Sequence, residues 1–201
     1  MTTSDYRTLV LIRRKRQTKA AIRRKSSIIQ QKLLAMEQIK TARHIFTYSN
    51  FRSEVETGQL ISALLAENKI VSVPLCNIEK RLMEAVSIEK KEQLAPGAWG
   101  IPEPLPAVTR TGRANPLSID VIIMPGAVFD FRGGRFGYGG GFYDRFVAGI
   151  PRAWRIAAAF ELQLTSRLPL KDHDQLVDYI VTERRIIPTG RGELVKRPSA
   201  R

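Results

Sequence analysis

The sequence predicts an α/β protein with three layers around a largely parallel β-sheet. Several short apolar runs have the length and composition of strands that are buried on both faces. Segments with helical spacing of apolar residues separate these runs, and this alternation is typical of a parallel sheet covered by helices. The 201 residues are enough for one domain with a sizeable core, so we expect a single domain over residues 1–201.

The first 43 residues are the most basic part of the chain. They contain twelve Lys or Arg and two acidic residues, and therefore hold ten of the fourteen excess positive charges. Apolar residues recur here at helical spacing, which predicts basic helices within residues 4–42. The positions in question are Leu9, Ile12 and Arg16, then Ile28, Ile29, Leu33 and Met36. Ser27 and Gln30 match a capping box for the second helix.

A basic segment of this kind has three interpretations. It can be a helix that closes over an anionic ligand, an arm that binds nucleic acid, or an Arg-rich transit peptide. The helical spacing favours a folded segment and disfavours a presequence that is removed.

Beyond residue 43, strands and helices alternate. We predict strands at 43–48, 70–75, 84–88, 119–124, 155–160 and 179–182. A helix is predicted at 56–67, where Leu60, Ile61, Leu64 and Leu65 share one face and Asn68 is a typical stop. The Pro- and Gly-rich stretch 94–106 is predicted to be a loop, and the tail from 189 to 201 is expected to be mobile.

A glycine-rich turn follows the apolar run at 119–124. Gly137, Gly139, Gly140 and Gly141 lack side chains, so their backbone can adopt positive φ and bring N–H groups close to an anion. The helix predicted from Phe142 onward would add its positive N-terminal end to the same place. This arrangement is typical of a phosphate-binding turn.

Two charged side chains flank these glycines. Arg135 offers several N–H donors to phosphate oxygens, and Asp144 offers an oxygen of the kind that Mg²⁺ prefers. Ligands of parallel sheets bind beyond the carboxyl ends of the strands, which is where this turn is expected to fall. The pattern predicts a site for a nucleoside triphosphate with Mg²⁺.

Two other interpretations of the turn stay open. Glycine-rich turns also occur where a chain merely bends, and a Phe/Arg/Gly-rich tract beside basic helices is typical of an RNA-binding protein. The chain has no G-x-x-x-x-G-K-[ST] motif, and Phe142 stands where a dinucleotide fingerprint needs its third glycine.

Few other residues suggest chemistry. Cys76 is the single cysteine and lies in an apolar run, which indicates a buried thiol rather than a nucleophile. His44 begins a predicted strand and His173 adjoins Asp174, so we expect structural roles for both histidines. The sequence shows no Cys/His cluster for zinc and no apolar run of membrane-spanning length. We expect a cytoplasmic monomer.

Four blocks of the chain together resemble the 5-formyltetrahydrofolate cyclo-ligases, also called methenyltetrahydrofolate synthetases. The blocks are Pro125–Asp130 with Gly134–Asp144, Phe51–Thr57, Trp99–Pro104, and His173–Asp178 with Val181–Glu183. They cover most of residues 43–187. The resemblance implies a fold of the type shared with ribose-phosphate isomerases and coenzyme A transferases.

The resemblance also implies an activity. The expected reaction is the ATP-dependent cyclisation of 5-formyltetrahydrofolate to 5,10-methenyltetrahydrofolate, with release of ADP and phosphate. ATP and Mg²⁺ would be the cofactors, and a reduced folate would be the substrate. We expect no membrane partner, and a nucleic-acid partner is disfavoured. An RNA-binding protein remains the alternative from another class.

The resemblance assigns roles to individual residues. Arg135, Tyr143 and Asp144 are expected to be catalytic, and Asp144 and Asp174 to hold Mg²⁺. The folate is expected to contact Glu54, Tyr48, Trp99, Tyr138 and Phe142. The nucleotide is expected to contact Arg7, Arg135, Phe136, Gly137, Tyr138, Gly139, Gly140, Gly141, Phe142 and Tyr143.

The N-terminus departs from the family's pattern. In that family a Lys, and an Arg four residues later, help to hold the nucleotide. Arg7 matches the Arg, but Thr3 stands at the position of the Lys. This departure keeps a third alternative open, namely a relative that binds folate or nucleotide but turns over weakly.

Overall fold

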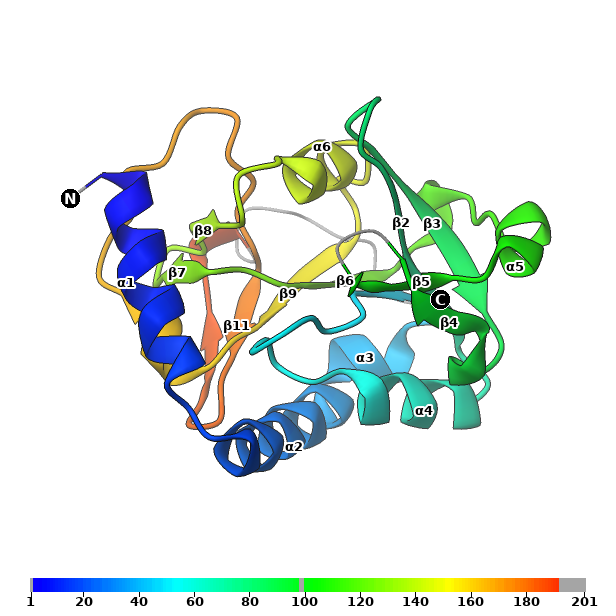
Figure 1. Cartoon of the computed structure of the whole chain (residues 1–201), viewed down its shortest axis with the longest axis horizontal. Helices are drawn as coiled ribbons and strands as arrows, with labels where there is room; N and C mark the ends of the chain where they lie inside the picture. The colour runs from blue at the N-terminus through cyan, green and yellow to red at the C-terminus, as the bar shows by residue number, and fades with distance from the viewer. Residues whose placement is uncertain (1, 98–99, 192–201) are drawn as a thin grey trace.

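A seven-stranded sheet forms the centre of the protein, which we describe from a computed structural model covering residues 2–97 and 100–191. The strand order is β12-β11-β9-β6-β1-β2-β3 (Figure 1). These strands are β1 (His44–Thr47), β2 (Ile70–Asn77), β3 (Leu82–Ile88), β6 (Val121–Met124), β9 (Trp154–Ala158), β11 (Tyr179–Val181) and β12 (Ile186–Pro188). The five from β11 to β2 run parallel, and β3 and β12 pair antiparallel at the two edges. The predicted largely parallel sheet is confirmed.

Helices cover both faces of the sheet. The covering helices are α2 (Lys19–Ala35), α3 (Glu37–Thr41), α4 (Gly58–Ala66) and α6 (Phe142–Ala148). Two more helices lie at the sides of the sheet, namely α1 (Thr3–Lys15) and α5 (Pro106–Thr111). Helices α2, α3 and α4 lie below the sheet in the view of Figure 1, and α6 lies above it. Ile29, Leu33 and Leu64 from the lower layer are fully buried against alternate residues of the strands, whereas Val147 of α6 is buried on the opposite side. The arrangement is the expected three-layer fold.

Central strands form where the apolar run is uninterrupted. All four residues of β1 and of β6 are buried, as expected for strands covered on both faces. His44 and Thr47 are the polar residues of β1, and the His44 ring is held by the hydroxyls of Ser118 (3.0 Å) and Ser72 (2.7 Å). Burial lowers the pKa of His44, so it is neutral and structural, as expected.

Helix α2 begins earlier than the capping box predicted. Its N-cap is Thr18, whose hydroxyl accepts a hydrogen bond from Ala21 N (3.1 Å). Ser27 lies in the middle of the helix, so the predicted start at this residue is wrong. Gln30 is buried there and accepts a hydrogen bond from Leu60 N (2.6 Å) at the start of α4, so it ties two helices together.

Helix α1 uses a different face from the one that its apolar residues mark. Leu9 and Ile12 are 39% and 45% exposed, whereas Val10 and Arg14 are buried. Val10 packs with Ala127, Val128 and Phe136 in a small core beside the sheet. The buried side of α1 therefore faces the segment that carries the glycine-rich turn.

The predicted loop at 94–106 is in part a hairpin. β4 (Leu94–Pro96) pairs antiparallel with β5 (Pro102–Pro104), and residues 98 and 99 between them lie outside the described residues. The prolines occupy the outer pairs of this short ladder, Leu94 with Pro104 and Pro96 with Pro102. Such positions, where few N–H groups are needed, are where strands tolerate proline.

A second hairpin separates β6 from the glycine-rich turn. β7 (Val128–Asp130) pairs with β8 (Arg135–Phe136) and with β10 (Leu164–Thr165). The sequence predicted that the glycine-rich turn follows the strand now seen as β6, but in the structure it follows β8. The fully buried Asp130 holds this hairpin, because its carboxylate accepts from the backbone N–H groups of Arg132, Gly134 and Leu168 at 2.8–3.0 Å.

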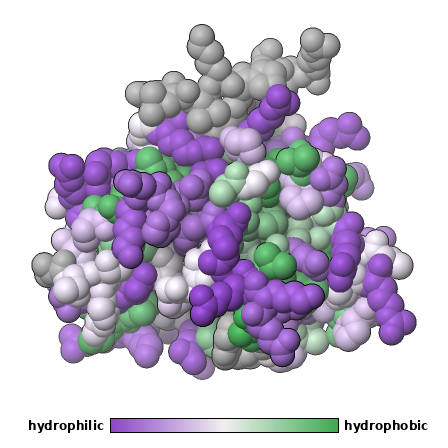
Figure 2. Space-filling model, turned by 90° about the horizontal axis from the view of Figure 1, so that it is seen from above, coloured by the Kyte–Doolittle hydropathy of each residue, from purple (hydrophilic) through white to green (hydrophobic). Residues whose placement is uncertain are grey.

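The carboxyl ends of β1, β6 and β9 open toward the segments that carry the predicted site residues. Figure 2 shows hydrophilic side chains over most of the face on which α6 lies, with small apolar patches between them. Within the described ranges no helix combines the length and the apolar character that a membrane span needs. The predicted mobile tail lies, from residue 192 onward, outside the described residues.

Candidate functional site

The glycine-rich turn is a run of unused backbone donors. Between Gly137 and Asp144, no backbone N–H donates to an acceptor within the described chain. Gly139 and Gly141 have φ of +102° and +65°, values that bring successive N–H groups to one side and that L side chains rarely adopt. Gly141 is also the N-cap of α6. The turn can bind an anion without first breaking a hydrogen bond of its own.

Arg135 lies beneath this turn and is paired with Asp144. The Arg135 side chain is 3% exposed, and its Nη2 donates to Asp144 Oδ1 at 2.9 Å. Nη1 donates to the carbonyl of Pro125 at 3.3 Å, and the buried Nε has no partner. The guanidinium thus fixes the carboxylate of Asp144 at the start of α6.

Arg7 reaches the same turn from α1. Its Nε donates to the carbonyl of Gly137 at 2.7 Å, and its guanidinium lies over the ring of Phe136, 5.5 Å from the centroid. Phe136 is buried and meets Tyr6 edge-on, which fixes α1 against β8. Thr3, at the position where the family has a Lys, is the first residue of α1.

Arg14, Tyr138 and Glu54 form a continuous chain of hydrogen bonds. Arg14 Nη2 donates to the hydroxyl of Tyr138 at 2.5 Å, and this hydroxyl donates to Glu54 Oε1 at 2.8 Å. Arg14 also donates to Ser53 Oγ and to the carbonyl of Gly126. The chain joins α1, the glycine-rich turn and the segment after β1 in one network.

Glu54 is a buried acid in an unusual environment. It is 7% exposed, and its Oε2 accepts from Phe51 N at 2.9 Å. Burial raises the pKa of Glu54 above its ordinary value, and the hydrogen bonds from Phe51 and Tyr138 with the charge of Arg14 offset this only in part. Buried acids with shifted pKa values are enriched in functional sites, which supports Glu54 as a site residue.

The aromatic residues named from the sequence divide into two groups. Tyr143 packs edge-on against Phe46, lies 5.6 Å from the Arg135 guanidinium, and has a buried hydroxyl without a partner. Burial raises the pKa of Tyr143 well above its ordinary value, so this hydroxyl is a neutral group available to a ligand. Tyr48 instead donates to the carbonyl of Val55 at 3.0 Å and so shapes the segment around Glu54.

Two further predicted residues have different outcomes. Phe142, the first residue of α6, is half-buried against the core, and the guanidinium of Arg145 lies over its ring. Trp99 lies outside the described residues. Cys76 is half-buried in β2, and burial raises the pKa of its thiol to about 11, which opposes a nucleophilic role.

Asp174 approaches Asp144 through its neighbour. Gln175 N lies 3.4 Å from Asp144 Oδ1, so the loop of Asp174 touches the start of α6. Asp144 Oδ2 has no donor in the described chain, and Asp174 Oδ1 has only His173 Nε2 at 3.9 Å. Among the described residues, no group of three or more His, Cys, Asp or Glu side chains is arranged so that it could hold a metal ion. Two carboxylates suit Mg²⁺, which usually keeps several waters, so the residues fit this ion.

Arg14 and Ser53 are site residues that the sequence reasoning missed. Arg14 lies seven residues after Arg7 and four after Val10, which puts the three side chains on one helical face. Helical spacing counted from Arg7, rather than from Leu9, would have found Arg14. No sequence pattern marks Ser53, because its hydrogen bond with Arg14 depends on where α1 packs.

Comparison with known proteins gives consistent results. The sequence model of the 5-formyltetrahydrofolate cyclo-ligase family matches residues 2–183. A 5-formyltetrahydrofolate cyclo-ligase of Mus musculus is 28% identical over 168 residues, covering 80% of this chain and 83% of the relative. One of Haemophilus influenzae is 30% identical over 163 residues, covering 77% and 83%. The structure of Aquifex aeolicus 5,10-methenyltetrahydrofolate synthetase superposes with a TM-score of 0.82 at 27% identity, covering 100% of this chain and 97% of the other.

Proposed function

The chain belongs to the 5-formyltetrahydrofolate cyclo-ligase family, and from this membership we propose that it converts 5-formyltetrahydrofolate and ATP to 5,10-methenyltetrahydrofolate, ADP and phosphate. The reaction is a ligation that forms a C–N bond in one-carbon metabolism. A cytoplasmic location, a monomeric state and a single domain remain predictions from the sequence.

The chemistry explains why ATP is needed. Ring closure requires an amine to attack a formamide carbon and expel its oxygen, which is a poor leaving group. Transfer of a phosphoryl group to the formyl oxygen makes that oxygen a good leaving group. The second amine of the folate then attacks the carbon, and phosphate departs. Catalysis of such a transfer depends mainly on positioning and on neutralising charge.

The observation that carries the proposal is the set of unpaired donors in the glycine-rich turn. The N–H groups from Gly137 to Asp144 have no acceptor among the residues that the structure describes, and Arg7 lies beside Gly139. We assign the phosphates of ATP to this turn, since phosphate oxygens accept several such hydrogen bonds at once. Arg135 would support the site through Asp144, to which it is bonded.

We assign Mg²⁺ to Asp144 and Asp174, whose free oxygens suit a hard cation. When bound, this ion would offset the negative charge of the triphosphate. The role of the protein is to hold the two carboxylates in place, Asp144 through Arg135 and Asp174 through Lys171 N at 2.8 Å.

We assign the pterin end of the folate to the region around the buried Glu54. A carboxylate accepts hydrogen bonds from the N–H groups at the edge of a pterin, and Tyr143 offers a flat ring and a free hydroxyl nearby. Burial, and secondly the charge of Glu54, raise the pKa of Tyr143, which supports placing the two side chains near each other in this assignment. Tyr138 links Glu54 to the glycine-rich turn through its hydroxyl.

A direct assay tests the function. Purified protein is mixed with ATP, Mg²⁺ and 5-formyltetrahydrofolate, and the ultraviolet absorption band of the methenyl product is followed. We expect product in proportion to the ADP released, and none without ATP. An Asp144→Ala variant is expected to lose activity at all Mg²⁺ concentrations, whereas Cys76→Ser retains it. Absence of the band together with tight, salt-sensitive binding of polynucleotides would favour the RNA-binding alternative.

A further inference from the structure

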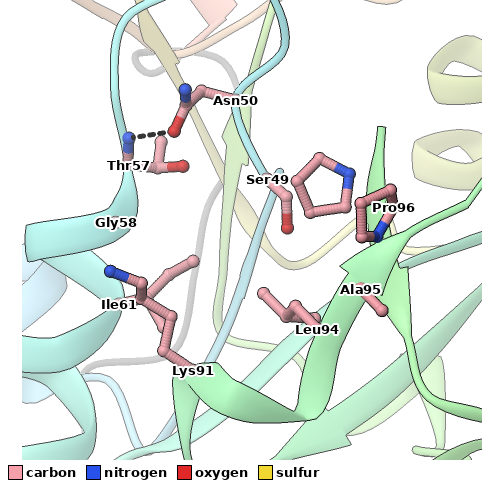
Figure 3. Close-up of a pocket in the computed structure, with 10 residues that line it drawn as sticks. Ser49, Asn50, Thr57, Gly58, Ile61, Lys91, Leu94, Ala95 and Pro96 are labelled. Carbon is pink, nitrogen blue, oxygen red and sulfur yellow. Dashed lines mark hydrogen bonds between the residues drawn. The ribbon is translucent and has the colours of Figure 1, made fainter. Parts of the chain in front are cut away.

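A cavity lies between the end of β1, the start of α4 and the β4–β5 hairpin (Figure 3). Its volume is about 230 Å³, and Glu54 is not among the residues that line it. Ile61, Leu94 and Pro96 provide apolar walls, and Ser49, Asn50, Thr57 and Lys91 provide polar side chains. The hydroxyl of Thr57 is already engaged, since it donates to the carbonyl of Tyr48 at 2.7 Å. The lining residues contain no acid.

Among the described residues, no acidic side chain pairs with the positive charge of Lys91 at this cavity. A Cβ placed on Gly58, the first residue of α4, would lie 3.6 Å from Lys91 Nζ, so the ammonium is close to the positive end of the helix. The first turn of α4 contains no acidic residue and no side-chain cap. In the part of the chain that the structure describes, Lys91 Nζ makes no hydrogen bond or ion pair, and Gly58 N and Gln59 N have no acceptor.

A buried hydroxyl points to a ligand independently of this charge. Ser49 is 6% exposed, and its Oγ has no hydrogen-bond partner. In Figure 3 the Ser49 hydroxyl projects into the space between α4 and the hairpin. Asn50 Oδ1 already accepts from Thr57 N at 3.1 Å, which leaves its amide N–H groups as donors. Ser49, Asn50 and Lys91 thus offer hydrogen-bond donors that a ligand with acceptor oxygens could use.

We propose that this cavity binds a glutamate carboxylate of the folate substrate. This inference rests on the proposed function. The two ends of a folate have opposite needs, because the pterin edge presents N–H donors whereas the glutamate presents carboxylates. Glu54 supplies an acceptor for the first, and Lys91, Ser49 and the start of α4 supply donors for the second. The apolar walls suit the methylene groups of the glutamate side chain.

The test compares two ligands that differ only in the tail. Binding of 5-formyltetrahydrofolate, and of 5-formyltetrahydropteroate, which lacks the glutamate, is measured by titration calorimetry on the full chain. For Lys91→Ala we expect the Kd of the complete folate to rise about fivefold and that of the truncated compound to stay unchanged. Ser49→Ala should shift only the complete folate too. The neighbouring Lys90→Ala is the matched control and should change neither.

Other outcomes separate the inference from the function. Equal weakening of both ligands by Lys91→Ala, or no weakening of either, would overturn the carboxylate assignment. So would equal affinity of the unaltered protein for the two compounds. Formation of the methenyl product is measured in a separate assay. If no product forms, the difference in affinity between the two ligands still tests the carboxylate assignment.

Discussion

The hydroxyl of Tyr138 has two hydrogen-bond partners, the atoms Arg14 Nη2 and Glu54 Oε1, and neither atom has another hydrogen bond within the described chain. It accepts from Arg14 Nη2 and donates to Glu54 Oε1, and both partner side chains are buried. A buried polar group left without a partner costs more than an average hydrogen bond contributes. Tyr138 is therefore a structural link as well as a member of the proposed site.

We predict that Tyr138→Phe lowers the free energy of unfolding by about 1–3 kcal/mol, because it leaves Arg14 Nη2 and Glu54 Oε1 without a hydrogen-bond partner. Urea denaturation followed by fluorescence measures this change. Tyr6→Phe is the control, since the Tyr6 hydroxyl makes no hydrogen bond in the described chain and its loss should have little effect. Equal destabilisation by the two substitutions would show that the hydrogen-bond chain contributes nothing specific.

Glu54 should give the protein a distinctive pH dependence. Its pKa in the folded chain is raised by burial, so the folded state holds a proton more tightly than the unfolded state. Between the ordinary pKa of a glutamate and this higher value, the free energy of unfolding should therefore fall as pH rises. Glu54→Gln should remove this fall, as measured by urea denaturation across that range, whereas Glu92→Gln, at an exposed position, should preserve it. A Glu54→Gln variant that keeps the slope would contradict the prediction.

At the scale of elements, the sequence predicted what depends on local pattern. The runs at 119–124 and 155–160 became β6 and β9, and Asn68, with φ of +58°, ends the region of α4 as predicted. The β7–β8 hairpin was missed because its turn is held by Leu168 N, which is 38 residues from Asp130 in the chain. Such contacts leave no periodic signal in the sequence.

The candidate site shows the same division. The glycines and Asp144 could be predicted because their chemistry is local to one segment. Arg14 could not be assigned to Glu54 from the sequence, since 40 residues and a helix crossing separate them, and the contact runs through Tyr138. The partners of a long side chain such as that of arginine become clear only once the packing of the helices and strands that carry them is known.

The glycine-rich turn gives a prediction at this scale. Gly139 has φ of +102°, and an added Cβ would meet only Arg7 Nη1 at 3.9 Å, so the penalty of Gly139→Ala is in the backbone rather than in space. Strain of this kind costs on the order of 1–3 kcal/mol and should distort the turn. We expect affinity for a non-hydrolysable ATP analogue to fall about tenfold. Gly190→Ala, where nothing lies within 4 Å, should leave it unchanged; equal affinities would argue against a role of the turn in nucleotide binding.

At the scale of the molecule, charge is concentrated rather than spread. Residues 1–43 hold ten of the fourteen excess positive charges, and α1 places two of its arginines at the site. Arg13, Arg23 and Arg24 are exposed and form no ion pair with described residues. The proposed ligands, ATP and folate, are both anionic, so we expect the positive potential of these arginines to speed their approach.

Salt tests this idea and separates it from RNA binding. Electrostatic steering raises the association rate and is screened by ions, with a Debye length of about 8 Å at physiological ionic strength. We predict that kcat/KM for ATP falls severalfold between about 50 and 300 mM salt, whereas kcat changes little. The double substitution Arg23→Gln and Arg24→Gln, away from the hydrogen-bond networks of Arg7 and Arg14, should flatten this dependence. If the double variant instead keeps the full salt dependence of kcat/KM and loses affinity for polynucleotides, the exposed arginines serve a nucleic-acid partner and not the substrates.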